Sequence, residues 1–171
     1  THLIAEVLSA GQQVLFLVPE IALTTQLIER LRRFFGDVVH VYHSRFSDRE
    51  RTETWMTVLH PKGGQLVVGA RSAVLLPLPK LGLIVVDEEH DSSYKQEDNI
   101  RYQARDLAVV RAKIEKNFIL LASATPSLET INNVKIKKYD QVYLSKQFSG
   151  TPLPEISIID LNKDKLDKDK W

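Results

Sequence analysis

The chain has 171 residues, of which 43% are hydrophobic and 26% are charged, as expected for one globular domain with a buried core. Its 23 basic and 22 acidic side chains nearly cancel, so any nucleic-acid binding must use locally placed groups. The sequence holds no cysteine, which excludes disulfides and thiolate zinc sites and favours a reducing cytoplasm. No apolar run approaches the ~20 residues that cross a bilayer, so we expect no membrane partner.

The first part of the chain alternates helical and strand patterns. Helical spacing begins at residues 3–8 with no cap before it, and we therefore expect the chain to be a fragment of a longer protein. The apolar run 14–18 predicts a strand buried on both faces. Apolar residues at helical spacing predict a helix over 23–35 that stops at Gly36, and residues 38–42 form a second short, β-branched run.

The next segment has a clear helix start. Ser47 and Glu50 have the spacing of a capping box, which predicts a helix beginning there. Phe34, Phe35 and Trp55 lie at helical spacing, and we expect them in the core rather than against bases.

Three further apolar runs, at 66–68, 83–86 and 118–122, fit central strands. The polar stretch 91–101 predicts a long loop, and the spacing within 104–114 predicts a helix. Strands that alternate with helices imply right-handed crossovers and a mainly parallel sheet covered on both faces. The sequence therefore predicts an open α/β domain.

The pattern weakens beyond Ser127. Residues 128–134 are compatible with a short helix, and 141–144 and 156–161 with strands. The tail 162–170 consists almost entirely of Lys and Asp, so we expect it to be solvated and disordered.

An acidic segment follows the predicted strand 83–86. In an open α/β sheet, ligands collect where the strands end at their carboxyl edge. Asp87 and Glu88 stand at such an end, the arrangement with which P-loop nucleotide hydrolases hold magnesium beside phosphates. Asp87 would hold the metal through water, and Glu88 would orient or deprotonate the attacking water. A solvated acidic turn is the alternative interpretation.

Hydroxyl side chains follow the next predicted strand. Ser123 and Thr125 alone are typical of helix caps. They follow the predicted strand 118–122, which comes next after the strand that ends at Asp87. At that position they would contact the carboxylates and His90 and sense the state of the nucleotide.

Several motifs together point to a family. They are V-P-E-I-A-L-T at 18–24, H-S at 43–44, G-A-R-S-A at 69–73, D-E-E-H-D-S-S-Y-K-Q at 87–96, R-Y-Q-A-R-D-L-A at 101–108 and S-A-T-P-S-L-E-T at 123–130. Over about residues 11–139 the chain resembles the first helicase lobe of the primosomal, replication-restart DNA helicases of bacteria, within superfamily 2. D-E-x-H with S-A-T is common to the superfamily, whereas D-S-S-Y-K-Q and R-Y-x-A-R-D are specific to this family.

The resemblance implies a RecA-like P-loop NTPase lobe in an ATP-driven motor that unwinds DNA with 3′ to 5′ polarity. ATP and Mg²⁺ would be its cofactors. Forked or single-stranded DNA, primosome proteins and single-strand binding protein would be its partners. The same resemblance implies that His90, Ser123 and Thr125 couple hydrolysis to movement.

Other residues match family segments that touch DNA. The resemblance assigns Pro19, Glu20, Thr24, Gly69, Arg71 and Ser72 to the bound strand. Helix capping and turn formation are the alternative for Thr24 and Ser72. His43 only matches a family position and receives no role.

The stretch 91–105 matches the aromatic-rich loop that links single-strand binding to hydrolysis in the family. Bases would stack on Tyr94 and Tyr102, and phosphates would meet Lys95, Arg101 and Arg105. An exposed charged loop with two packed tyrosines is the alternative. The chain departs from the family at Ile100, where an aromatic residue is usual, and at Gln103, where histidine is frequent.

No G-x-x-x-x-G-K-[ST] motif occurs in the sequence. The resemblance places this phosphate-binding loop upstream of Thr1, so we expect residues 1–145 to be a first lobe that lacks it and binds Mg-ATP weakly. Residues 146–171 would then be a linker toward a second lobe. The second lobe and the family's zinc-binding cysteines are expected outside this chain.

Two other functions remain open. The chain could be a passive single-strand binding module whose acidic edge is only solvated. It could also be a metal-dependent phosphoesterase with Asp87, Glu88, His90 and Asp91 as ligands, which the spacing disfavours because neighbouring residues on an extended segment point to opposite sides.

Overall fold

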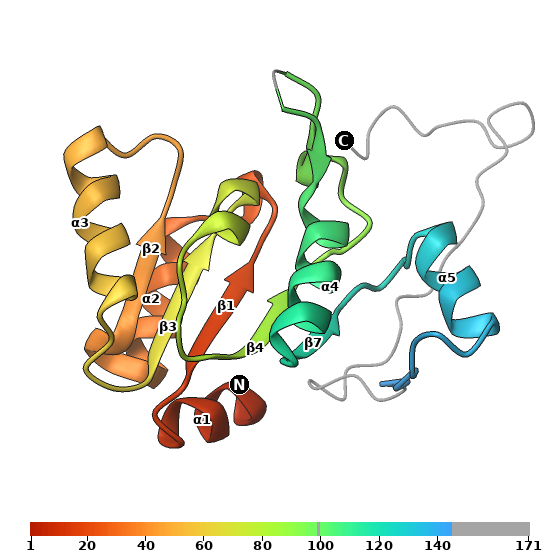
Figure 1. Ribbon diagram of the computed structural model, residues 1–171, viewed down its shortest axis with the longest axis horizontal. Coiled ribbons are helices and arrows are strands. Elements are labelled where there is room, and N and C mark those ends of the chain that lie inside the picture. Colours follow the sequence, from red (N-terminus) through yellow and green to blue (C-terminus); the bar gives the residue numbers. More distant parts are fainter. Residues whose placement is uncertain (99, 145–171) are drawn as a thin grey trace, which may run out of the picture.

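A central parallel sheet organises the molecule, for which the computed structural model describes residues 1–98 and 100–144. Five strands lie in the order β2-β3-β1-β4-β7, each parallel to its neighbour, and Figure 1 shows them side by side. Their bounds are β1 Gln13–Leu17, β2 Val39–Tyr42, β3 Gln65–Gly69, β4 Leu81–Val86 and β7 Phe118–Leu121. The predicted open α/β architecture is confirmed.

Helices precede, connect or follow the strands of the sheet. They are α1 His2–Ser9, α2 Thr25–Phe35, α3 Asp48–Leu59, α4 Ala104–Glu115 and α5 Leu128–Lys135. Short 3₁₀ helices cover Glu20–Ala22, Gly36–Val38, Arg71–Leu75 and Ser92–Tyr94. A small antiparallel hairpin of β5 Lys95–Gln96 and β6 Tyr102–Gln103 precedes α4 and projects beyond the end of the sheet in Figure 1.

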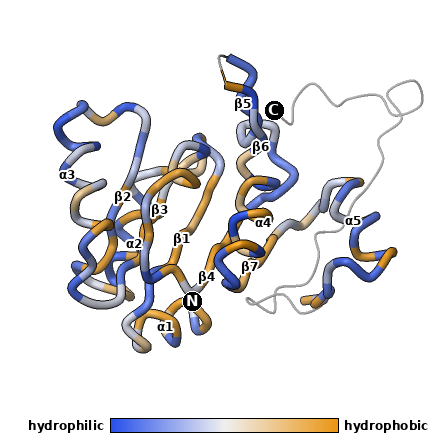
Figure 2. The backbone as a smooth tube through the Cα atoms, viewed as in Figure 1, coloured by the Kyte–Doolittle hydropathy of each residue, from blue (hydrophilic) through white to orange (hydrophobic). Residues whose placement is uncertain are grey.

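The sheet has a hydrophobic core on each face. One core contains Ile4 of α1 and Leu31 of α2, and the other contains Val58 of α3 and alanines of α4 such as Ala108. The central strands β1, β3 and β4 are mostly apolar, as the hydropathy colouring of Figure 2 shows for β1 and β4. β4 is buried at every position because helices or turns cover both of its faces. The predicted covering of both faces is confirmed.

Local capping signals place the helix ends as predicted. At the start of α3 the backbone N–H of Ser47 donates to Glu50 Oε2 at 2.8 Å, and the N–H of Glu50 donates back to Ser47 Oγ at 3.4 Å. Gly36 ends α2 with a φ of 67°, a conformation that glycine adopts at little cost. The regular part of α2 begins at Thr25, because Thr24 caps it.

β7 is an edge strand, so the expectation that residues 118–122 form a central strand is wrong. Within the described residues only β4 pairs with it, and its side chains alternate between exposed and half-buried. Phe118 is 80% exposed. An apolar run does not reveal strand order, because order depends on pairing between distant segments.

Three further sequence predictions are corrected. Phe34 and Trp55 are exposed rather than part of the core. Phe35 is partly buried and packs against the core that contains Ile4 and Leu31. Residues 141–144 form no strand, and their large side chains are exposed. The stretch 91–101 is not a plain loop, since it holds a 3₁₀ helix and β5.

Some predictions fall on residues outside those described. The strand at 156–161, the disordered tail at 162–170 and the linker at 146–171 all belong there. The short helix expected at 128–134 is confirmed as α5. Among the described residues, no helix is both long enough and apolar enough to cross a bilayer.

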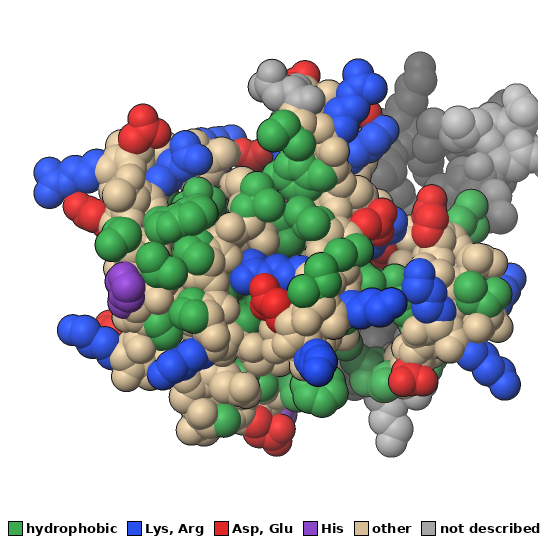
Figure 3. All heavy atoms as spheres, in the orientation of Figure 1, with side chains coloured by type: hydrophobic (Ala, Val, Ile, Leu, Met, Phe, Trp, Pro, Cys, Tyr) green, Lys and Arg blue, Asp and Glu red, His purple; other side chains and the backbone are tan. Residues whose placement is uncertain are grey.

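A shallow apolar groove lies between the 3₁₀ helix Arg71–Leu75 and α4. Leu75, Val110 and Ile114 line it together with Arg111 and Glu115. On the face shown in Figure 3, hydrophobic side chains gather toward the middle, with a basic and an acidic side chain among them. The groove contains none of the predicted catalytic side chains. The chemistry must therefore be sought at the carboxyl edge of the sheet.

Candidate active site

The two predicted catalytic carboxylates stand directly at the end of β4. The backbone N–H of Asp87 donates to the carbonyl of Leu17 at 2.9 Å, which continues the pairing of β4 with β1. Both Asp87 and Glu88 are half-buried at the rim. Glu88 has a φ of 44°, in the left-handed region that non-glycine residues rarely adopt. The chain therefore turns sharply at the residue expected to act on water.

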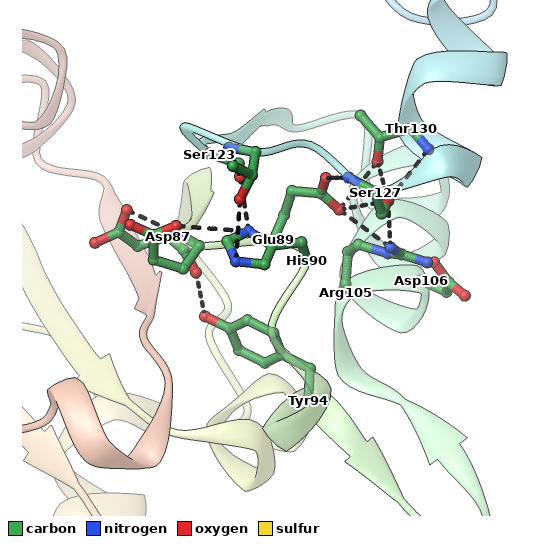
Figure 4. Close-up of polar contacts among 11 residues, drawn as sticks. Asp87, Glu89, His90, Tyr94, Arg105, Asp106, Ser123, Ser127 and Thr130 are labelled. Carbon is green, nitrogen blue, oxygen red and sulfur yellow. Dashed lines mark hydrogen bonds and ion pairs between the residues drawn. The ribbon is translucent and has the colours of Figure 1, made fainter. Parts of the chain in front are cut away.

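His90 joins the acidic segment to the hydroxyl turn, as Figure 4 shows. Its Nδ1 lies 2.7 Å from Ser123 Oγ, and its Nε2 lies 3.4 Å from Thr125 Oγ1. The Oε2 of Glu88 lies 3.5 Å from the same Nδ1. The structure thus brings all the predicted catalytic side chains except Asp87 into one chain of contacts, with Asp87 beside Glu88.

Glu89, which received no role in the sequence analysis, is the most enclosed acid of the segment, with 1% of its surface exposed. Its carboxylate accepts hydrogen bonds from the Ser127 backbone N–H at 2.7 Å and from Thr130 Oγ1 and Arg105 Nη1 at 3.0 Å each. Burial acts to raise the pKa of Glu89, but these hydrogen bonds outweigh it and hold the pKa below its usual value. The carboxylate is therefore held in its charged form.

Arg105 is committed to this network, which corrects its expected contact with DNA phosphates. Its guanidinium is buried and pairs with Glu89 at 3.0 Å and with Asp106 Oδ1 at 2.9 Å. A buried, doubly paired guanidinium has little left to offer a phosphate.

Tyr94 is fully buried, so the expected stacking of a base on its ring is wrong for this conformation. Its hydroxyl donates to the backbone carbonyl of Asp87 at 2.6 Å. Burial raises the pKa of Tyr94, and the negative charge of Asp87 adds to the shift. The ring packs in the core beneath the catalytic segment and supports the position of Asp87.

The remaining loop residues divide by exposure. Lys95 is exposed and pairs with Glu97 at 2.7 Å, and Arg101 is also exposed. Tyr102 is half-buried against the core. Lys95 and Arg101 are placed where they can meet phosphates, which stays a prediction.

Arg71 ties the segment after β3 to this loop. Its Nη1 donates to the carbonyls of Ser93 and Lys95, while the neighbouring Ser72 is half-buried. Gly69 has no room for a side chain, since a Cβ there would meet the carbonyl oxygen of Tyr42 at 2.7 Å. These packing requirements explain part of the G-A-R-S motif without reference to a ligand.

The segment after β1 has its own polar contacts. Pro19 is buried, and Thr24 accepts a hydrogen bond from Leu27 N–H, so the capping interpretation of Thr24 is confirmed. Glu20 Oε1 accepts a hydrogen bond from Ser44 Oγ at 3.2 Å and lies 3.9 Å from His43 Nε2. A DNA contact by these residues stays a prediction.

The motif series and this geometry agree with the comparisons to known proteins. The sequence pattern of the DEAD/DEAH box helicases matches residues 2–134. The chain belongs to the DEAD/DEAH box helicase family. Its lobe is accordingly RecA-like, as the sequence predicted.

Individual relatives narrow the comparison within the helicases. The chain is 47% identical over 99% of its length to replication restart protein PriA of Rickettsia conorii. It is 44% identical over 95% of its length to PriA of Haemophilus influenzae and 40% identical over 94% to PriA of Bacillus subtilis. The chain spans about a quarter of these relatives' own length, with shares of 26%, 22% and 20%.

The rim of this helicase lobe suits a magnesium ion that is completed by water and phosphate oxygens. Hard carboxylate oxygens are ligands that Mg²⁺ prefers, and it commonly uses one or two of them. Asp87 makes no ion pair with Lys or Arg in the part of the chain that is described. Among the described residues, three or more His, Asp or Glu side chains do not converge on one metal position.

Two residues of this lobe, Glu89 and His43, make contacts that the sequence did not predict. Glu89 sits inside the D-E-E-H motif, but its burial depends on Arg105 and Ser127 from elsewhere in the chain. His43 accepts the N–H of Arg45 at Nδ1, so its proton lies on Nε2, toward Glu20. The contacts of Glu89 with Arg105 and Ser127, and of His43 with Glu20, join segments that are distant along the chain, so no local pattern signals them.

Proposed function

We propose that the chain forms part of the first motor lobe of an ATP-dependent DNA helicase that acts in replication restart. The observation that carries this proposal is His90, which contacts both the acidic rim through Glu88 and the hydroxyl turn through Ser123. The names of the relatives, each a replication restart protein, support the biological setting. We place its action in the cytoplasm, with 3′ to 5′ polarity.

The residues of the rim would divide the catalytic work. Bound Mg-ATP supplies the phosphoryl group whose transfer to water releases free energy. Asp87 would hold the magnesium ion through water, and Glu88 would orient the attacking water and accept its proton. His90 would move when the charge at Glu88 changes. Its movement would shift Ser123 and Thr125, which begin the next segment of the lobe.

DNA would bind along polar groups at the same edge of the sheet, most of which are exposed. The candidates are Glu20, Thr24, Ser72, Lys95 and Arg101, with Gly69 and Arg71 shaping the surface. Lysine and arginine would meet phosphates, whereas hydroxyls and backbone amides near glycine would fix the strand's register. Tyr94 and Arg105 would not contact DNA but would hold Asp87 and Glu89 in place from inside the lobe.

The whole protein would contain more than this lobe. We propose that residues 1–145 belong to the first lobe and that 146–171 lead to a second. The phosphate-binding loop, the second lobe and zinc-binding cysteines would lie outside these 171 residues. Primosome proteins and single-strand binding protein would be partners of the complete helicase.

A hydrolysis and unwinding assay on the full-length protein tests the proposal. Glu88→Gln should lower DNA-stimulated ATP hydrolysis by about 10²–10⁴-fold, the usual range for loss of a general base, and should abolish unwinding. Glu53→Gln, a matched change of an exposed acid on α3, should leave both rates unchanged. A forked duplex with a 3′ single-stranded arm should be unwound, and one with only a 5′ arm should not.

The same assay distinguishes the helicase proposal from the alternative of a passive single-strand binding module. If Glu88→Gln retained both salt-dependent oligonucleotide binding and unwinding, the acidic rim would have no motor function. The chain would then be a single-strand binding module.

A further inference from the structure

Glu89 connects three segments that carry the proposed chemistry. Its backbone N–H donates to the carbonyl of Ala122 at 3.1 Å, which fixes the end of β4 to the end of β7. Its side chain points away from Asp87 and His90 and toward Ser127 and Arg105, as Figure 4 shows. Glu89 is therefore bonded at both its backbone and its carboxylate to segments other than its own.

The first of these segments is the hydroxyl turn. The backbone N–H of Ser127 donates to Glu89 Oε1 at 2.7 Å, and Ser127 Oγ donates to Glu89 Oε2 at 3.0 Å. Ser127 is also the N-cap of α5 and accepts the N–H of Thr130. Ser127 follows Thr125 by two residues, so the carboxylate fixes the far end of the turn whose near end contacts His90.

The second segment is the first turn of α4. Arg105 lies two residues after β6, and α4 continues directly from the β5–β6 hairpin. Exposed Lys95 and Arg101 belong to that hairpin region. A displacement of the hairpin would therefore pull on Arg105 and, through the ion pair, on Glu89.

Stability alone does not explain a carboxylate at this position. Replacing a buried ion pair with apolar side chains of similar volume is often neutral or stabilising. A buried charge with hydrogen-bond donors on two separate segments instead specifies one arrangement of those segments, because any other arrangement leaves the charge unpaired.

We propose that Glu89 is a positioning residue that makes the hydroxyl turn and the β5–β6 hairpin move as one unit with the catalytic rim. This inference rests on the proposed function. DNA at the hairpin would then change the geometry at His90 and Ser123 through Glu89, without a direct contact between DNA and the rim.

The first test measures ATP hydrolysis by the full-length protein with and without single-stranded DNA. Glu89→Gln should lower the ratio of DNA-stimulated to DNA-free rate at least fivefold. Arg111→Gln is the control, because Arg111 ties the same helix to the carbonyls of Val74 and Leu76, away from the rim. An unchanged ratio in Glu89→Gln, or an equal loss in Arg111→Gln, would overturn the inference.

The second test is independent of catalysis. Hydrogen exchange of the full-length protein without nucleotide should be at least tenfold faster over residues 123–130 in Glu89→Ala, and slightly faster over 102–106, with little change over β1 and β3. Exchange at 123–130 equal to that of the original protein would refute the positioning role whether or not the protein hydrolyses ATP. A protein that showed this exchange effect but no DNA-stimulated hydrolysis would contradict the proposed function and leave Glu89's structural link standing.

Discussion

The Nδ1 of His90 lies 2.7 Å from the Oγ of Ser123, although 33 residues separate them along the chain. The contact exists because β4 and β7 are adjacent and parallel, so their carboxyl ends meet at one rim. Ser123 Oγ also accepts the backbone N–H of Thr125 at 3.0 Å. One hydroxyl thus links the imidazole to the conformation of the turn.

This contact predicts that hydrolysis and unwinding can be separated. In the full-length protein, Ser123→Ala should slow unwinding about tenfold more than ATP hydrolysis, within the range of typical coupling energies. Ser9→Ala, a matched change at the exposed end of α1, should alter neither. Parallel ATPase and strand-separation assays measure the two rates. Equal loss of both rates in Ser123→Ala would contradict a coupling role for this hydroxyl.

The left-handed backbone at Glu88 predicts that glycine at this position gives a more stable protein than alanine. With a φ of 44°, Glu88→Gly should be more stable than Glu88→Ala by about 1 kcal/mol, because glycine tolerates this conformation. The same pair of changes at Glu53, inside α3, should have the opposite sign by about 1 kcal/mol. Urea unfolding of the four variants checks both differences. Equal stability of the two Glu88 variants would show that this residue carries no backbone strain.

Packing at Gly69 predicts a strong effect of a single methyl group. A Cβ there would meet Ala73 Cβ at 2.5 Å and the Tyr42 carbonyl oxygen at 2.7 Å, so Gly69→Ala should lower the free energy of unfolding by about 1–3 kcal/mol. Gly63→Ala is the control, since no atom lies within 4 Å of its Cβ position. Thermal and urea denaturation compare them. If Gly69→Ala proved as stable as Gly63→Ala, the glycine would have to be explained by a ligand instead.

The environment of His40 predicts part of the pH dependence of stability. Burial, and secondarily the charge of Arg32, lower the pKa of His40 from its usual 6.5. The unfolded chain therefore binds this proton more readily, and the folded state loses stability as the pH falls below about 6.5. His40→Gln should be less sensitive to pH between about 7.5 and 5.5 in urea unfolding. The same slope for both proteins would exclude His40 as a contributor.

The missing phosphate-binding motif predicts weak nucleotide affinity. The 171 residues contain no G-x-x-x-x-G-K-[ST], so no such loop amides or lysine are present to hold the β- and γ-phosphates of ATP. Titration calorimetry of this chain with Mg-ATP should show no binding in the micromolar range. Micromolar affinity would mean that the rim binds phosphates by another route.

Local patterns in the sequence predicted most of the elements and the catalytic rim. Strand runs and helical spacing depend on neighbouring residues, and so do the capping box at Ser47 and the glycine stop at Gly36. The rule that ligands meet the carboxyl ends of parallel strands then predicts that Glu88 and Ser123 lie at one edge.

Contacts between distant segments decided the rest. Tyr94 faces the core rather than a base because its hydroxyl bonds the carbonyl of Asp87 and its ring packs among core residues. Phe118 lies at the edge of the sheet because β7 pairs with β4 alone among the described strands. The role of Glu89 depends on Arg105 and Ser127, which approach it only in the folded chain. Burial and charge pairing are properties of the assembled packing, so no local pattern contains them.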